Sequence, residues 1–267
     1  MSEAIVSLLG PVNWPLFALV SARVVGLMMM APLWSMQAIP ARIRGAAAVV
    51  LTLMLLPAAA AAPVDLGGPL PMPLLLIEFL IGLAIGITAA VFLHGLTIAA
   101  EVLGLQMGLS LGAALGGMTE MGTPGIGQLY AQTALVIFAT LGGHVILVTA
   151  LGGSLAALPP GAALDLVDGG RTLIGMIGSV FGVAVRVAAP VMVALLVTNL
   201  ALALLNRAVP QLNTMMVAVP ITIAVGLVAI GSTLLLFGAE AARWVEGLDD
   251  GVAALVGALR PVPAGGP

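Results

Sequence analysis

Charged residues are scarce in this sequence. Only 7% of its 267 residues are Asp, Glu, Lys or Arg, and lysine is absent altogether. Soluble domains carry about 25% charged residues, so the composition argues against a water-soluble globular protein. Eight arginines against eleven acidic residues give a net charge of −3. Because this balance leaves no basic patch, we expect no nucleic-acid partner.

Cysteine is also missing, and histidine is rare. The sequence has no Cys and only two His, His94 and His144, which excludes disulfides, thiolate chemistry and cysteine-ligated metals. Two lone histidines are more often hydrogen-bonded structural residues than metal ligands. We therefore expect no metal site and no cofactor.

Apolar residues are present in large excess: 61% of the chain is hydrophobic, and the mean hydropathy is +1.24. These values predict a protein embedded in membrane lipid. A membrane-spanning helix needs about 20 mostly apolar residues, and six stretches qualify: residues 15–36, 45–62, 73–103, 128–158, 172–205 and 213–237. We expect an all-α, helical-hairpin membrane protein with about six long helices, kinked at Pro32, Pro190 and Pro220.

The domain organisation expected from the sequence is simple. Residues 1–240 should form a single membrane-associated helical domain. Residues 241–267 should form a short amphipathic helix near 252–259, followed by a disordered tail rich in Pro and Gly.

Four charged residues lie within or beside the apolar stretches: Arg23, Glu78, Glu101 and Arg186. A charge at the centre of a membrane-spanning helix costs about 2.5–3.5 kcal/mol, so each must pair or face water. They are candidates for a polar lining or for contacts between subunits. The alternative is an ion pair within the chain, such as Arg23 with Glu78.

A glycine-rich segment, GLQMGLSLGAALGGMTEMGTPGIG, occupies residues 104–127. Its first four glycines recur every four residues, which favours close helix packing, and the later glycines and Pro124 interrupt a helix. Unwound backbone at membrane depth persists only where protein covers it or where it lines a watery cavity, and methionine adapts to varied shapes. We predict a pore constriction or plug; tight packing followed by a plain turn is the alternative. The candidate gate residues are Gly104, Met107, Gly108, Gly112, Gly116, Gly117, Met118, Met121 and Gly122.

The same segment matches a serine-hydrolase pattern. GLSLG places Ser110 in a G-x-S-x-G motif, which needs a strand-to-helix turn to expose the serine. Both flanks here are apolar and predicted helical, so the match is weak. A hydrolase using Ser110 with His94 or His144 remains a minor alternative, and we expect no enzymatic activity.

The stretch APVMVALLVTNLALALLNRAVPQLNTMMVAVP, residues 189–220, resembles the most recognisable segment of the flagellar biosynthesis protein FliR family. Its core is NRAVPQLN, and AAEVLGLQMGLS at residues 99–110 and LGGHVILVTALGGSLAALPPG at residues 141–161 follow the family in order. We call residues 206–220, which begin with NRAVPQLN, the late motif and interpret it as a structural break between two long helices. Its polar side chains would form hydrogen bonds with the backbone groups that the break leaves without helical partners. Its candidate residues are Arg207, Pro210, Gln211, Asn213 and Pro220.

This resemblance implies a structural and gating subunit of a type III protein export apparatus, acting on unfolded exported proteins. It implies FliP-like and FliQ-like partners, further export-apparatus proteins, assembly into a helical export gate, and a place in the bacterial inner membrane at the flagellar basal body. Related proteins serve injectisomes, so flagellar and injectisome cargo both stay open. A small-solute secondary transporter, with substrate near Arg23, Glu78 and Arg186, is the main alternative.

Overall fold

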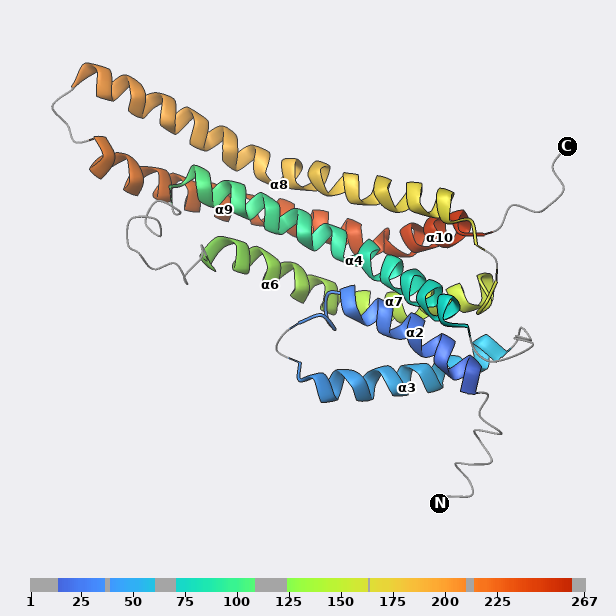
Figure 1. The fold of residues 1–267 in the computed structure, drawn as a ribbon. Coiled ribbons are helices and arrows are strands. Elements are labelled where there is room, and N and C mark those ends of the chain that lie inside the picture. Colours follow the sequence, from blue (N-terminus) through green and yellow to red (C-terminus); the bar gives the residue numbers. More distant parts are fainter. Residues whose placement is uncertain are drawn as a thin grey trace, which may run out of the picture. The chain divides into compact units, whose positions relative to one another are not determined.

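The computed structural model describes residues 14–36, 39–60, 71–108, 124–162, 164–209 and 214–260. Every regular element in these ranges is an α-helix (Figure 1), as the composition predicts. The helices are α2 (Trp14–Met30), α3 (Ala41–Ala60), α4 (Met72–Gln106), α6 (Pro124–Thr140), α7 (Gly143–Ala157), α8 (Leu166–Ala208), α9 (Thr214–Glu246) and α10 (Leu248–Ala258).

All six predicted apolar stretches contain helix, but two of them differ from a plain span. The first helix ends at Met30, so Pro32 lies beyond its end and kinks nothing. The stretch at 128–158 is divided into α6 and α7, with a break at residues 141–142. Gly142 lies at this break with φ +74°, a left-handed conformation that a side chain disfavours. Pro190 and Pro220 do lie inside helices, α8 and α9.

By length and composition, four of the described helices can cross a membrane: α3, α4, α8 and residues 216–233 of α9. The bent pair α6 and α7 makes a fifth if it acts as one span. Helix α8 is the longest, with 43 residues.

Packing divides the chain into two compact units. The first comprises residues 1–90, 143–175 and 247–267, and the second comprises residues 91–142 and 176–246. Helices α4 and α8 contribute to both units, since each continues across a boundary. The predicted domain boundary at residue 240 stays a prediction.

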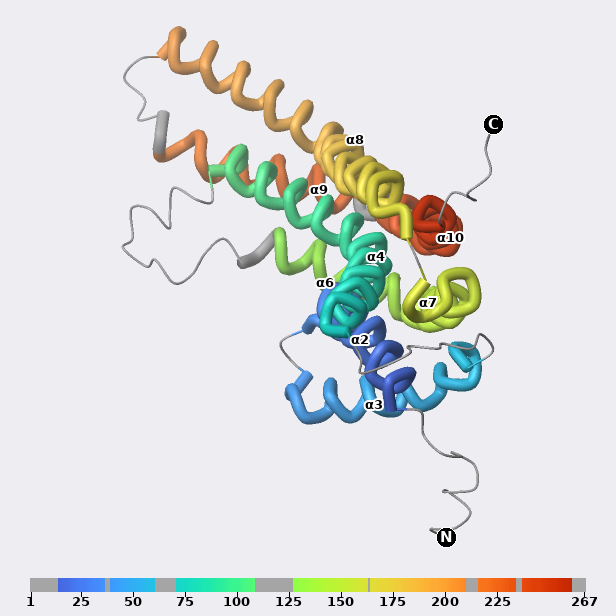
Figure 2. The backbone as a smooth tube through the Cα atoms, turned by 45° about the vertical axis from the view of Figure 1, so that its right-hand side comes forward, coloured from blue at the N-terminus to red at the C-terminus, as the bar shows by residue number. Residues whose placement is uncertain are grey.

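In the first unit, α3 packs against α2 and α7, and α10 packs against α7 (Figure 2). Helix α10 is the predicted short amphipathic helix, although it begins earlier, at Leu248. It buries Leu248, Val252 and Leu255 while exposing Asp249 and Asp250.

The core of the second unit lies between the later half of α4, α6, the middle of α8 and the later half of α9. Aromatic side chains mark its centre: Phe92 stacks on Trp244, with ring centroids 4.7 Å apart, and Tyr130 meets Phe237 edge to face at 5.1 Å. Within this unit, α8 and α9 form a hairpin whose tip extends past the end of α4 (Figures 1 and 2).

Candidate functional site

Arg23 on α2 and Glu78 on α4 form a fully buried ion pair in the first unit. The side chains are only 1% and 2% exposed, and Nη2 of Arg23 lies 2.6 Å from Oε2 of Glu78. Nε of Arg23 donates to the same oxygen at 2.7 Å. Two guanidinium nitrogens thus converge on one carboxylate oxygen, in a charge-assisted contact that is stronger than a hydrogen bond between neutral groups. The structure therefore contains the intramolecular pair that the sequence offered as the alternative.

Other polar groups complete this buried cluster. Arg23 also donates to Oγ of Ser154 at 3.2 Å and to the carbonyl oxygen of Leu158 at 3.0 Å. The backbone N–H of Gly161 donates to the second carboxylate oxygen of Glu78 at 3.1 Å. Because the two charges pair with each other and with these further groups, the cluster links α2, α4, α7 and the turn after α7 without leaving a buried charge uncompensated.

Glycines bring α2 and α4 close enough for this pair to form. A Cβ at Gly82 would overlap the carbonyl oxygen of Arg23, and one at Gly26 would overlap the carbonyl oxygen of Phe79. Gly86, four residues after Gly82, lies against the carbonyl oxygen of Leu27 in the same way. Gly82 and Gly86 thus form a G-x-x-x-G packing contact. It was not predicted from the sequence, where close packing was expected instead at the glycines of residues 104–116.

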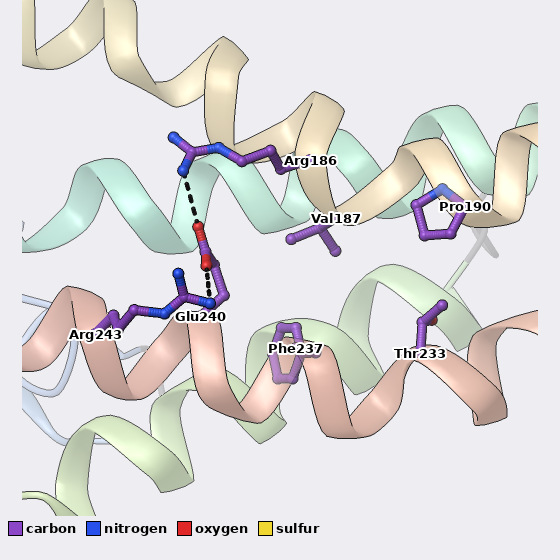
Figure 3. A pocket seen from close by; sticks show the side chains of 7 residues that line it. All are labelled: Arg186, Val187, Pro190, Thr233, Phe237, Glu240 and Arg243. Atoms are coloured by element: carbon purple, nitrogen blue, oxygen red, sulfur yellow. Dashed lines mark ion pairs between the residues drawn. The ribbon is translucent and has the colours of Figure 1, made fainter.

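Arg186, Glu240 and Arg243 form a second, exposed charge cluster in the second unit (Figure 3). Nη1 of Arg186 lies 3.2 Å from Oε1 of Glu240, and Nη2 of Arg243 lies 2.9 Å from Oε2. The two arginine side chains are 68% and 69% exposed, and that of Glu240 is 17% exposed. They line a pocket of about 270 Å³ together with Val187, Pro190, Thr233 and Phe237.

The other candidate charges and histidines do not join either cluster. Glu101 and His94 are exposed on α4, and His144 lies at the start of α7. Among the described residues, no group of three His, Cys, Asp or Glu could hold a metal ion. Ser110, the candidate nucleophile, lies outside the described residues.

The candidate gate is described only at its start. Helix α4 ends at Gln106, and Gly108 follows with φ +75°, earlier than the predicted interruption, which was placed at the later glycines and Pro124. Met107 is fully buried against Gly226 of α9, and Oγ1 of Thr222 donates to its carbonyl oxygen at 3.2 Å. Gly104 is buried, although a Cβ there would meet no described atom within 4 Å. Gly112, Gly116, Gly117, Met118, Met121 and Gly122 lie outside the described residues.

The late motif lies at the tip of the α8–α9 hairpin. Arg207 is exposed in the last turn of α8, and Pro220 lies in the second turn of α9. Pro210, Gln211 and Asn213 lie outside the described residues. The motif therefore coincides with the predicted junction between two long helices.

Large apolar side chains are exposed over the whole hairpin tip, which we define as residues 196–209 and 216–221. Fully burying one such side chain is worth about 1.5–3 kcal/mol, so this surface is unstable in water. Monomeric soluble proteins seldom expose such continuous apolar patches. The exposed residues are Leu196, Val197, Leu200, Leu204, Leu205, Val209, Met216, Val217 and Ile221.

Comparison with known proteins identifies the family. The family described as bacterial export proteins, family 1, matches residues 14–247. The chain belongs to this family. Its relatives include the flagellar biosynthetic protein FliR of Escherichia coli K12, 31% identical over 227 residues that cover 85% of each chain.

Two further relatives carry the same name. FliR of Pectobacterium carotovorum is 29% identical over 83% of each chain, and FliR of Caulobacter vibrioides is 31% identical over 79% of this chain and 84% of its own. The FliR resemblance noted from NRAVPQLN is thereby confirmed. The chain is a membrane protein of the flagellar export apparatus, in a family of structural subunits rather than known enzymes.

Proposed function

We propose that this chain is a structural and gating subunit of the flagellar type III export apparatus, which forms part of the export pore with FliP-like and FliQ-like partners. Its substrates are unfolded exported proteins, and its place is the bacterial inner membrane at the flagellar basal body.

The length of the exposed apolar surface on α8 carries this proposal. At 1.5 Å per residue, its 43 residues extend about 64 Å, whereas the hydrocarbon core of a bilayer is about 30 Å thick. Even a tilt of 40°, the upper end of the usual range, accommodates only about 39 Å. Exposed apolar side chains nevertheless occur from Leu166 to Leu205. Lipid alone cannot cover them all, which supports cover by other protein subunits.

The beginning of the glycine-rich segment supports a gating role. Met107 is buried, and its carbonyl oxygen accepts a hydrogen bond from the Thr222 hydroxyl, so the end of α4 is held against α9. Gly108, in a left-handed conformation, then turns the chain out of the helix. The candidate gate, residues 104–122, thus begins at a rigid anchor. Glycine and methionine make a seal with little chemical preference, which suits a pore that passes every kind of side chain.

The secondary-transporter alternative has less support. A solute near Arg23 and Glu78 would have to displace a buried ion pair whose members also bind Ser154, Leu158 and Gly161. Breaking a buried pair of this kind is strongly unfavourable.

Co-purification tests the assembly part of the proposal. The full-length tagged chain is extracted from membranes that also contain the FliP-like and FliQ-like subunits of the same bacterium, and the proteins that accompany it are identified by mass. We expect both partners in fixed ratio. A chain that is monodisperse by itself and moves solutes in liposomes would contradict the proposal.

Ion leakage tests the gating part. Deletion of residues 118–122 should make the assembled complex leak ions across the membrane, because it shortens the proposed seal. The control is a five-residue deletion at 62–66, between α3 and α4. A deletion complex that assembles fully and remains tight would rule out the plug.

A further inference from the structure

Arg186 and Arg243 share a single carboxylate, so their cluster keeps an uncompensated positive charge. One oxygen of Glu240 binds Arg186 and the other binds Arg243. Within the described ranges, neither arginine has a second carboxylate within 4.0 Å. The Nε atoms of the two arginines donate only to carbonyl oxygens of their own helices, at 3.4 Å. A guanidinium has five N–H donors, so both side chains can accept a further anionic partner.

This charge lies within an apolar face. Phe181 and Val185 are exposed on α8 just before Arg186, and Val193 and Leu196 are exposed after it. The pocket beside Arg186 is lined mainly by apolar atoms, including those of Val187, Pro190 and Phe237 (Figure 3). An exposed arginine in such a surface needs a nearby anion wherever water is excluded.

The position of Arg186 along α8 favours a protein anion over a lipid phosphate. The next charged residues on the helix are Arg171 and Arg207, which lie about 22 Å and 32 Å away along the axis at 1.5 Å per residue. A phosphate at the bilayer surface could reach Arg186 only if one of these long apolar flanks lay wholly outside the lipid, where another protein subunit would have to cover it. A carboxylate on a neighbouring protein helix meets no such difficulty.

We infer that the Arg186–Glu240–Arg243 cluster receives an Asp or Glu side chain from a helix of another export-apparatus subunit. The partner's carboxylate binds Arg186 beside Glu240, and its apolar residues pack on the exposed side chains of α8. A pocket of about 270 Å³ is roughly nine times the share of one water in the liquid, which is enough for an acidic side chain. This inference rests on the proposed function, because it requires a partner subunit.

The first test is charge reversal in the full-length chain, co-expressed with FliP-like and FliQ-like subunits. We expect Arg186→Glu to reduce the co-purified partner at least about tenfold. Arg171→Glu is the matched control, since Arg171 is an exposed arginine on the same helix, 78% exposed and 3.5 Å from Asp168. That variant should retain the partner. Equal recovery with Arg186→Glu and wild type would overturn the inference while leaving the proposed function intact, whereas no partner with wild type would refute the proposed function itself.

Selection of second-site suppressors separates a lost contact from a misfolded chain. Motile revertants of Arg186→Glu should carry an Asp or Glu changed to Lys or Arg in a partner subunit, and the purified revertant complex should regain its partner. Suppressors confined to this chain would overturn the inference. The inference would also be overturned if Arg186→Glu lost co-purified anionic lipid, measured by mass spectrometry, but kept its protein partner. The anion bound by Arg186 would then be a lipid phosphate.

Discussion

The two units of this molecule contain the same kind of ion pair in opposite surroundings. Arg23 and Glu78 are buried, and three further groups of the chain bind them. Arg186 and Arg243 are mostly exposed, and they share one carboxylate. The Arg23–Glu78 pair finds its hydrogen-bonding partners within the chain, whereas the two arginines that share Glu240 can still bind another anion. Residue type and apolar context therefore do not distinguish these two clusters, whereas the number of hydrogen-bonding partners within the chain does.

The largest effect should come from removing half of the buried pair. Arg23→Leu leaves the buried Glu78 without an opposite charge, which we expect to destabilise the protein by about 3–5 kcal/mol. Thermal unfolding of the purified protein in detergent measures this loss. Arg171→Leu, at an exposed position, is the control and should change stability by less than about 0.5 kcal/mol. An Arg23→Leu variant as stable as the control would remove the distinction between the clusters.

A smaller effect should come from separating the helices that hold this pair. Gly82→Ala places a methyl group against the carbonyl oxygen of Arg23, and overpacking of this kind costs about 1–3 kcal/mol. Gly45→Ala in α3, where the added Cβ meets no described atom within 4 Å, should instead be neutral or stabilising by up to about 1 kcal/mol. The difference between the two unfolding midpoints is the measurement. If both substitutions act alike, close approach at Gly82 is not what holds α2 against α4.

In the second unit, Gly226→Ala should cost about 1 kcal/mol. The new Cβ would lie 2.6 Å from the side chain of Met107, which is flexible and able to move. Combining it with Met107→Ala tests the contact, because residues in contact show coupling energies of about 0.5–3 kcal/mol. A double-mutant cycle on unfolding in detergent provides the value. Strictly additive effects would mean that the end of α4 is not anchored on α9.

The smallest effect on stability should come from the exposed cluster. Arg186→Gln breaks an ion pair whose arginine is largely exposed, and such pairs contribute about 0–1 kcal/mol. The unfolding midpoint of the separately purified chain should therefore hardly change, in contrast to Arg23→Leu. A loss as large as that of Arg23→Leu would show that the exposed cluster is also structural.

The fold class follows from the sequence, because apolar stretches of this length form helices in a membrane. The position of the break between α6 and α7 was not predicted, since G-G at residues 142–143 lies within a continuous apolar run and only its backbone conformation marks the break. The pairing of Arg23 with Glu78 was foreseen as an alternative, because an apolar environment demands a partner for each charge.

Other parts of the candidate sites needed coordinates. Glu240 was assigned to a tail boundary, and nothing in the order of residues indicates that α9 places it beside Arg186. The contacts of Gly26 with Phe79 and of Gly82 with Arg23 join residues more than 50 positions apart. Sequence patterns report local periodicity, whereas such contacts depend on how distant helices pack.

Cross-linking at the hairpin tip shows whether protein covers the exposed apolar surface of α8. The chain has no cysteine, so Leu200→Cys introduces a unique thiol that can carry a benzophenone label. After illumination in native membranes, mass spectrometry identifies whatever lies beside Leu200. We expect a covalent adduct with a FliP-like or FliQ-like subunit, and adducts with lipid alone would mean that protein does not cover this surface.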